Sequence, residues 1–127
     1  MENNRMLLIS AAGTRKTKHW PRSEMLWSEF TERLRTPARS TETLEEYLAY
    51  AKQRQDDLKD VGGFVGGTFA NDIRKAAYVE GRDLLTLDLD NIPAGGTEDV
   101  LKRVCGLGCA AAVYSTRKHA GYAPRLR

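Results

Sequence analysis

One stretch of the sequence constrains the fold more than any other: residues 84–91, which read LLTLDLDN. It begins with four apolar or β-branched residues and ends with Asp88 and Asp90, separated by one leucine. A short apolar run of this kind predicts a buried strand. The chain therefore places two acidic side chains where its most strand-like segment ends.

A second apolar run, CAAAVYST at residues 109–116, predicts another buried strand. Thr97 is a candidate cap for a short helix between the two, over residues 98–104, and Gly106 is suited to end that helix. Strand, helix and strand in this order predict two parallel neighbours in an α/β (α+β) sheet. The carboxyl ends of parallel strands share one edge, which is where open sheets of this kind usually bind ligands.

The spacing of Asp88 and Asp90 predicts that both side chains point to the same face, about 6.6 Å apart along the chain. Two desolvated like charges repel, and a divalent cation between them removes that cost. Mg²⁺ or Mn²⁺ suits this site because such ions take carboxylate and phosphate oxygens. The alternative is that the pair marks the point where a strand leaves the core and meets solvent.

The segment that follows the second strand is basic, and residues 110–127 contain no acid. Its polar groups are the hydroxyls of Ser115 and Thr116, the ring of His119 and the guanidinium groups of Arg125 and Arg127. Guanidinium forks match phosphate oxygens, and the R-x-R spacing puts both forks on one strand face. We expect this segment to converge with the acidic pair. The alternative is a solvated basic loop with a surface histidine.

The first half of the chain carries local signals of its own. Residues 5–11 predict a first strand, and residues 13–21 a basic loop. Apolar residues at 25, 26, 30 and 34 fit one face of a helix, and Thr43 and Glu46 have the spacing of a capping box. The inner face of that second helix is expected to consist of Leu44, Tyr47, Leu48, Ala51 and Leu58.

Four glycines lie among apolar residues in VGGFVGGTFA, residues 61–70. Glycines in a strand-like run predict bends or the close approach of another backbone or a ligand. The stretch lacks the lysine and hydroxyl residue of a phosphate-binding P-loop.

The 127 residues fit one domain, and 41% hydrophobic with 29% charged residues is ordinary for a globular protein. The net charge of +3 permits contact with nucleic acid. The cluster of basic residues Arg15, Lys16 and Lys18 either makes such a contact or belongs to a solvated loop. Cys105 and Cys109 exclude a disulfide framework, and we expect them to be buried thiols in a reducing compartment. With neither a signal peptide nor a membrane span in the sequence, we expect a cytoplasmic protein.

Three motifs, TLDLD, YSTRKH and APRLR, occur in an order that resembles the catalytic core of archaeo-eukaryotic-type primases. More narrowly, the chain is similar to the primase-polymerase-like replication proteins of phages and prophages. KDVGGFVGG at residues 59–67 and the basic pair Arg74 and Lys75 also fit those proteins, as do ISAAGTRKTKHW and TETLEEYLAY, so the resemblance covers nearly the whole chain.

The resemblance implies an RRM-like or palm-like sheet with flanking helices, and a site for nucleotidyl transfer with Mg²⁺ or Mn²⁺. It assigns metal binding to Asp88 and Asp90 and a catalytic role to both acids and to His119. It assigns contacts with the phosphates of a nucleoside triphosphate to Ser115, Thr116, Arg125 and Arg127. Related sequences often have histidine at the position of Arg117, so residue 117 and residue 119 are both candidates for the motif histidine. A single-stranded nucleic acid is the implied second partner.

The resemblance also implies a third carboxylate on a strand beyond the P-R-x-R motif. We therefore expect residues 1–127 to be the N-terminal portion of a longer primase-polymerase domain, inactive alone, with an exposed sheet edge that favours self-association.

Two other functions are weighed. One is a non-catalytic nucleic-acid-binding module on the same scaffold. The other is a rolling-circle nickase or relaxase, which needs paired histidines for its metal and a tyrosine nucleophile. His19 and His119 are a hundred residues apart, and Tyr114 and Tyr122 are the nearby tyrosines, so this function is disfavoured.

Overall fold

The computed structural model describes residues 4–127 and divides into two compact units. The first unit ends at Leu85 and the second runs from Thr86 to Arg127. The α+β class expected from the sequence is confirmed, since short antiparallel sheets and four α-helices occur in residues 4–127.

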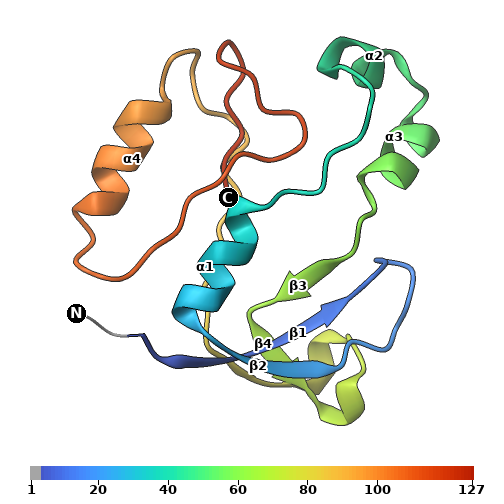
Figure 1. Cartoon of the computed structure of the whole chain (residues 1–127), viewed down its shortest axis with the longest axis vertical. Helices are drawn as coiled ribbons and strands as arrows, with labels where there is room; N and C mark the ends of the chain where they lie inside the picture. Colours follow the sequence, from blue (N-terminus) through green and yellow to red (C-terminus); the bar gives the residue numbers. More distant parts are fainter. Residues whose placement is uncertain (1–3) are drawn as a thin grey trace. The chain divides into compact units, whose positions relative to one another are not determined.

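A three-stranded antiparallel sheet forms the centre of the first unit (Figure 1). Its strands are β1 (Met6–Ala12), β2 (Arg22–Leu26) and β3 (Gly63–Val65), in the order β2-β1-β3. β1 is the strand expected at residues 5–11. The connection from β1 to β2 is the basic loop, so both segments were correctly located from the sequence.

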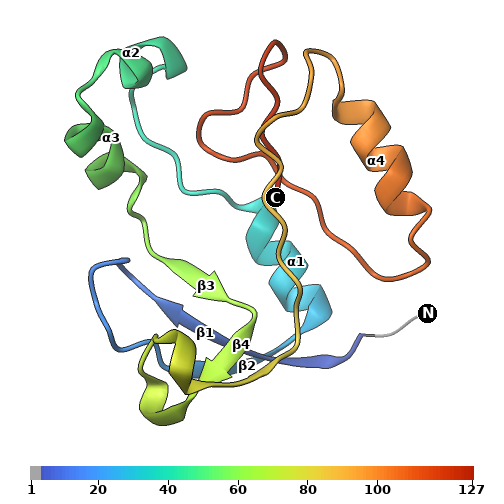
Figure 2. The same cartoon turned by 180° about the vertical axis from the view of Figure 1, so that it is seen from behind.

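Helix α1 (Trp27–Arg35) covers one face of this sheet (Figures 1 and 2). Leu7 and Ile9 alternate with exposed residues along β1 and pack with Met25 and Phe30 in the core. This alternation has the period of two that a half-buried strand requires. The apolar residues at 25 and 26 were predicted to start the helix, but they end β2 instead, because Met6 and Leu7 of β1 pair with them.

The capping box at Thr43 is confirmed. The Thr43 hydroxyl accepts a hydrogen bond from the Glu46 amide at 3.1 Å, and the Glu46 carboxylate accepts one from the Thr43 amide at 2.8 Å. This helix, α2 (Leu44–Ala49), is followed by a separate helix, α3 (Lys52–Lys59). One continuous helix through Leu58 was therefore the wrong prediction.

The break between α2 and α3 lies at Tyr50, whose ψ of 153° is extended. Tyr47 is fully buried, and its hydroxyl donates to the carbonyl of Gln55 at 3.0 Å. Leu48, expected on the inner face, is 44% exposed. Because the helix stops, its inner face is short and centres on the tyrosine.

The glycine-rich stretch forms β3 and β4 (Gly67–Phe69), and β4 pairs with β5 (Val79–Arg82). A side chain at Gly67 would place a Cβ 2.1 Å from the carbonyl oxygen of Gly81. The expected close approach of another backbone is therefore confirmed. Two 3₁₀ turns, η1 (Ala70–Asp72) and η2 (Ala76–Tyr78), connect these strands.

The second unit contains helix α4 (Thr97–Cys105) and otherwise extended segments and turns (Figure 1). Gly106 ends the helix as expected, but the prediction that Thr97 caps it is wrong, because Gly96 is the N-cap and Thr97 is the first helical residue. Residues 84–90 and 109–116 were predicted as buried parallel strands, and this is wrong. Leu85 is 82% and Leu87 60% exposed. Only Leu89 and Ser115 form isolated bridges in these two runs, since neither run has a partner strand along its length.

The prediction that Cys105 and Cys109 are buried is also wrong, because both are free and exposed. Both follow or end α4, which has no buried residue. A search of residues 4–127 finds no helix with the length and apolar character needed to cross a bilayer.

Candidate functional site

The candidate site in the second unit is organised by the closing tripeptide of the chain, Arg125–Arg127. Leu126 forms antiparallel bridges with both Leu89 and Ser115. The amides and carbonyls of Leu89 and Leu126 exchange two hydrogen bonds, at 2.9 and 3.0 Å. On its other side, Arg127 exchanges two with Tyr114, at 3.0 and 2.9 Å. The closing tripeptide thus lies between the two segments that were expected to be direct neighbours.

This arrangement explains why the expected convergence occurs although the parallel pair does not. Both flanking segments run antiparallel to the tripeptide, so they run in the same direction as each other. Their carboxyl ends consequently lie at the same side, as parallel strands would place them. The inserted tripeptide brings its arginines to the acids directly.

The acids and arginines are cross-strand neighbours. With Leu89 opposite Leu126, Asp88 lies opposite Arg127 and Asp90 opposite Arg125. Arg127 donates to both carboxylate oxygens of Asp88, at 2.6 Å from Nε and 3.2 Å from Nη2. The guanidinium of Arg125 lies 3.7 Å from the Asp90 carboxylate. Leu126, buried to 4% exposure, points to the other face.

These ion pairs are accessible to solvent. The side chains of Asp88 and Asp90 are 56% and 55% exposed, and those of both arginines are 39% exposed. The hydrogen bond that Arg127 donates to Asp88 is the largest cause that raises the pKa of Arg127, and a hydrogen bond with Tyr114 also raises it. Partly exposed pairs gain little net energy from each other, so a charged ligand can exchange with either partner.

His119 is tied to the same tripeptide through its ring. Its Nδ1 accepts a hydrogen bond from the Arg125 amide at 3.1 Å, and its own amide donates to the Thr116 carbonyl at 3.0 Å. An Nδ1 that accepts leaves the proton of the neutral ring on Nε2. His119 is therefore held in the tautomer that offers Nε2–H as a donor.

The two predicted hydroxyl ligands fall on different faces. Thr116 pairs with Arg125, its amide donating to the Arg125 carbonyl at 3.1 Å, and so shares the arginine face. Ser115 pairs with Leu126 and therefore lies on the opposite face. The pairing brings Thr116, but not Ser115, to the side of the charged residues.

Tyr114 is a residue of this face that sequence reasoning did not assign to the phosphate-binding set. It contacts the Arg127 side chain and pairs with its backbone. The signal was present in the alternation of residues 114, 115 and 116, since a residue two before Thr116 shares its face.

Two carboxylates are a fitting but partial ligand set for a hard divalent cation. Mg²⁺ commonly takes one or two carboxylates together with substrate phosphates, and Asp88 and Asp90 share a face. Residues 4–127 contain no cluster of three or more His, Cys, Asp or Glu side chains placed to hold a metal. The remaining ligands would have to come from phosphate oxygens or water.

The fold and this site define an α+β chain that sets paired acids against paired arginines. The family model described as VapE N-terminal domain matches residues 1–127, the whole chain. The protein therefore belongs to the VapE N-terminal domain family, whose members are phage and prophage replication proteins. No curated protein and no solved structure matches the chain.

Proposed function

We propose that this chain is the N-terminal portion of a primase-polymerase-type nucleotidyl transferase and that its second unit binds a nucleoside triphosphate together with Mg²⁺ or Mn²⁺. The observation that carries the proposal is the pairing of Asp88 with Arg127 and of Asp90 with Arg125. The acids suited to a cation and the forks suited to phosphate face one another across adjacent segments. A role in phage or prophage replication agrees with the family.

Binding then proceeds by an exchange of partners. Arg125 and Arg127 leave the carboxylates and donate their N–H groups to phosphate oxygens, for which the planar fork is suited. The carboxylates of Asp88 and Asp90 then become available to bind a divalent cation. His119 offers Nε2–H, and Thr116 its hydroxyl, to the same anionic group. A divalent cation, when bound, supplies the charge that joins carboxylates to phosphates.

The exchange predicts that metal and triphosphate bind interdependently. Triphosphate alone competes with Asp88 for Arg127, and the metal alone competes with Arg127 for Asp88. We expect Mn²⁺ to tighten triphosphate binding at least about fivefold in calorimetric titrations of the whole chain, and triphosphate to tighten Mn²⁺ binding by the same factor.

Asp88→Asn distinguishes this exchange from a purely structural ion pair. The variant removes one metal ligand and releases Arg127. The factor by which Mn²⁺ tightens triphosphate binding therefore falls toward one, while triphosphate binds more tightly in the absence of metal. Arg103→Ala on α4 is the matched control and leaves both affinities unchanged. Equal triphosphate affinity with and without Mn²⁺ in the unmodified chain contradicts the proposal.

One observation favours the non-catalytic module as a second candidate. Both carboxylates already have cationic partners, so they can act purely as cross-strand ties between segments. In that function the chain binds single-stranded nucleic acid without metal, and affinity falls with salt. Asp88→Asn then lowers the stability of the second unit without creating a gain in triphosphate binding.

We place the protein in the cytoplasm, where replication takes place and free cysteines stay reduced. Self-association through a sheet edge also stays a prediction. Sedimentation over a range of protein concentrations tests it, and a monomer at all of them opposes it.

A further inference from the structure

The first unit brings together two basic segments that are more than fifty residues apart in the sequence. The Arg74 amide donates to the Lys18 carbonyl at 2.9 Å, and His19 forms an antiparallel bridge with Ile73. Lys18, Arg74 and the next residue, Lys75, are all exposed. We call these three residues the basic surface.

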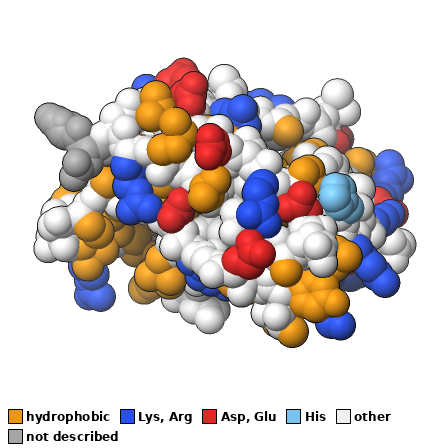
Figure 3. Space-filling view, turned by 90° about the horizontal axis from the view of Figure 1, so that it is seen from below, with side chains coloured by type: hydrophobic (Ala, Val, Ile, Leu, Met, Phe, Trp, Pro, Cys, Tyr) orange, Lys and Arg blue, Asp and Glu red, His pale blue; other side chains and the backbone are white. Residues whose placement is uncertain are grey.

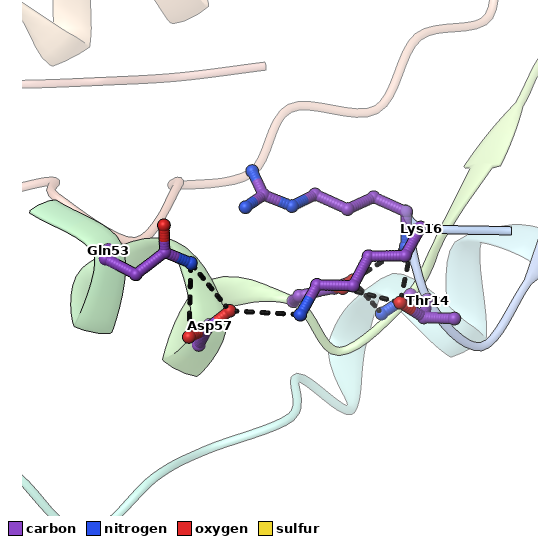
Figure 4. A network of polar contacts seen from close by, with 7 residues as sticks. Thr14, Lys16, Gln53 and Asp57 are labelled. Atoms are coloured by element: carbon purple, nitrogen blue, oxygen red, sulfur yellow. Dashed lines mark hydrogen bonds and ion pairs between the residues drawn. The ribbon is translucent and has the colours of Figure 1, made fainter.

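The other cations of the β1–β2 loop have acidic neighbours. The Lys16 ammonium lies 3.2 Å from the Asp57 carboxylate, which also accepts from Gln53 (Figure 4). The Arg15 amide donates to Asp60 at 2.8 Å. These contacts hold the pKa of both aspartates below the usual range, with hydrogen bonds from Lys16 and from Thr14 as the largest causes. In this half of the loop, Lys16 is therefore paired with α3, and the backbone at Arg15 is tied to the C-cap residue of that helix.

Two of the three cations of the basic surface, Arg74 and Lys75, instead lie over aromatic rings. The Arg74 guanidinium lies 4.6 Å from the centroid of Trp20, and the Lys75 ammonium 5.5 Å from that of Tyr78. Trp20 is buried to 3% exposure and fixed by a hydrogen bond from its indole N–H to the Thr17 carbonyl at 2.9 Å. A cation over a ring keeps its charge and the outward donors of its edge.

Within residues 4–127, no acidic side chain pairs with Lys18, Arg74 or Lys75. Figure 3 shows that one end of the face it presents carries a histidine among cationic side chains, with acidic side chains also present there. Lys18, Arg74 and Lys75 thus have no ion-pair partner among these residues, and their charges are available to an anionic partner.

We propose that the basic surface binds the backbone phosphates of a single-stranded nucleic acid. Exposed cationic donors without acidic partners, two of them over aromatic rings, fit phosphate oxygens, which draw most protein contacts to nucleic acid. The surface lies wholly in the first unit and shares no residue with the proposed triphosphate site. The choice of a single strand rests on the proposed function, which needs a template.

The test measures binding of a labelled single-stranded oligonucleotide to the whole chain by fluorescence anisotropy from low to moderate salt. Each phosphate contact contributes about 0.7 to the slope of log affinity against log salt, so three contacts give a slope near −2. Lys18→Ala should weaken binding about fivefold at 0.1 M salt, and Lys18→Ala with Lys75→Ala about 25-fold, with a slope near −0.7.

Lys16→Ala is the matched control, since it removes the same charge from the same loop where Asp57 already neutralises it. It should change the affinity less than twofold, and Lys18→Arg should retain binding. Equal losses in Lys16→Ala and Lys18→Ala overturn the proposal, because they show a general charge effect.

Two competition arms address the partner. Tighter binding to a duplex of equal length, or to anionic lipid vesicles, overturns the assignment to a single strand. Titration of triphosphate with Mn²⁺ into the same double variant separates the two sites. If the double variant no longer binds the oligonucleotide but still binds triphosphate, the result supports the basic surface. If Asp88→Asn alone abolishes binding of both the oligonucleotide and triphosphate, the result counts against the proposed function instead.

Discussion

The two units of this chain achieve order by different means. The first has a core of Leu7, Ile9, Met25 and Phe30 between a sheet and a helix. The second has no buried residue on its only described helix, and its buried apolar side chains are Pro124 and Leu126, both in the last four residues. Backbone pairing of its closing tripeptide and ion pairs take the place of a core.

The difference in burial between the two units indicates which of them is better suited to hold a ligand-binding site. Apolar burial gives the first unit most of its stability, because the hydrophobic effect scales with the area removed from water. The second unit has little such area to bury and keeps its charged groups accessible. Groups that must exchange partners with a ligand are better placed in the less packed unit.

The largest expected effect is the loss of stability when a side chain is removed from the core of the first unit. Phe30 is 6% exposed and meets Phe64 edge to face, with centroids 5.0 Å apart. Phe30→Ala should destabilise the first unit by about 3–5 kcal/mol, through lost burial and a cavity. Urea denaturation measures the change. Leu101→Ala on α4, where the side chain is 42% exposed, should stay within about 0.5 kcal/mol. Similar losses in both variants contradict the contrast.

The second unit should depend on Leu126. Leu126→Ala should destabilise the pairing of its flanking segments by about 2–3 kcal/mol, near the lower end for buried leucine, because the small unit collapses readily around the gap. Hydrogen exchange of the Leu89 and Tyr114 amides should quicken while amides in β1 stay protected. Uniform loss of protection across both units opposes their separate stability.

A smaller effect concerns the ion pair at the candidate site. A double-mutant cycle with Asp88→Asn and Arg127→Gln should give a coupling of about 0.2–1 kcal/mol, since both side chains are partly exposed. The Glu32–Arg35 pair in α1, at 3.4 Å and highly exposed, is the control and should couple more weakly. High salt should reduce both couplings. A coupling that resists salt argues against an accessible pair.

The smallest effect depends on pH. Asp60 accepts hydrogen bonds from the Thr14 hydroxyl and the Arg15 amide, which lower its pKa in the folded chain. Its stabilisation is therefore fully present above the unfolded pKa of 3.8 and is lost as pH falls through the lower folded value. Thermal unfolding of Asp60→Asn should differ from the unmodified chain at pH 7 and converge with it at strongly acidic pH. A constant difference contradicts this origin.

Local sequence signals predicted several elements correctly. The capping box at Thr43 and Glu46, the alternation of β1 and the end of α4 at Gly106 each involve groups only a few residues apart. Interactions over such short distances in the chain depend on local geometry, which sequence spacing states directly. The shared face of Arg125 and Arg127 was predictable for the same reason.

The long-range pairing was decided by the tertiary structure alone. Residues 84–90 and 109–116 have strand-like composition, yet a strand exists only where a partner supplies hydrogen bonds along its length. The structure gives these runs the closing tripeptide as a short shared partner, and so sets Asp88 against Arg127. Likewise, composition could not tell Lys16 from Lys18, because only the fold decides which cation meets a carboxylate.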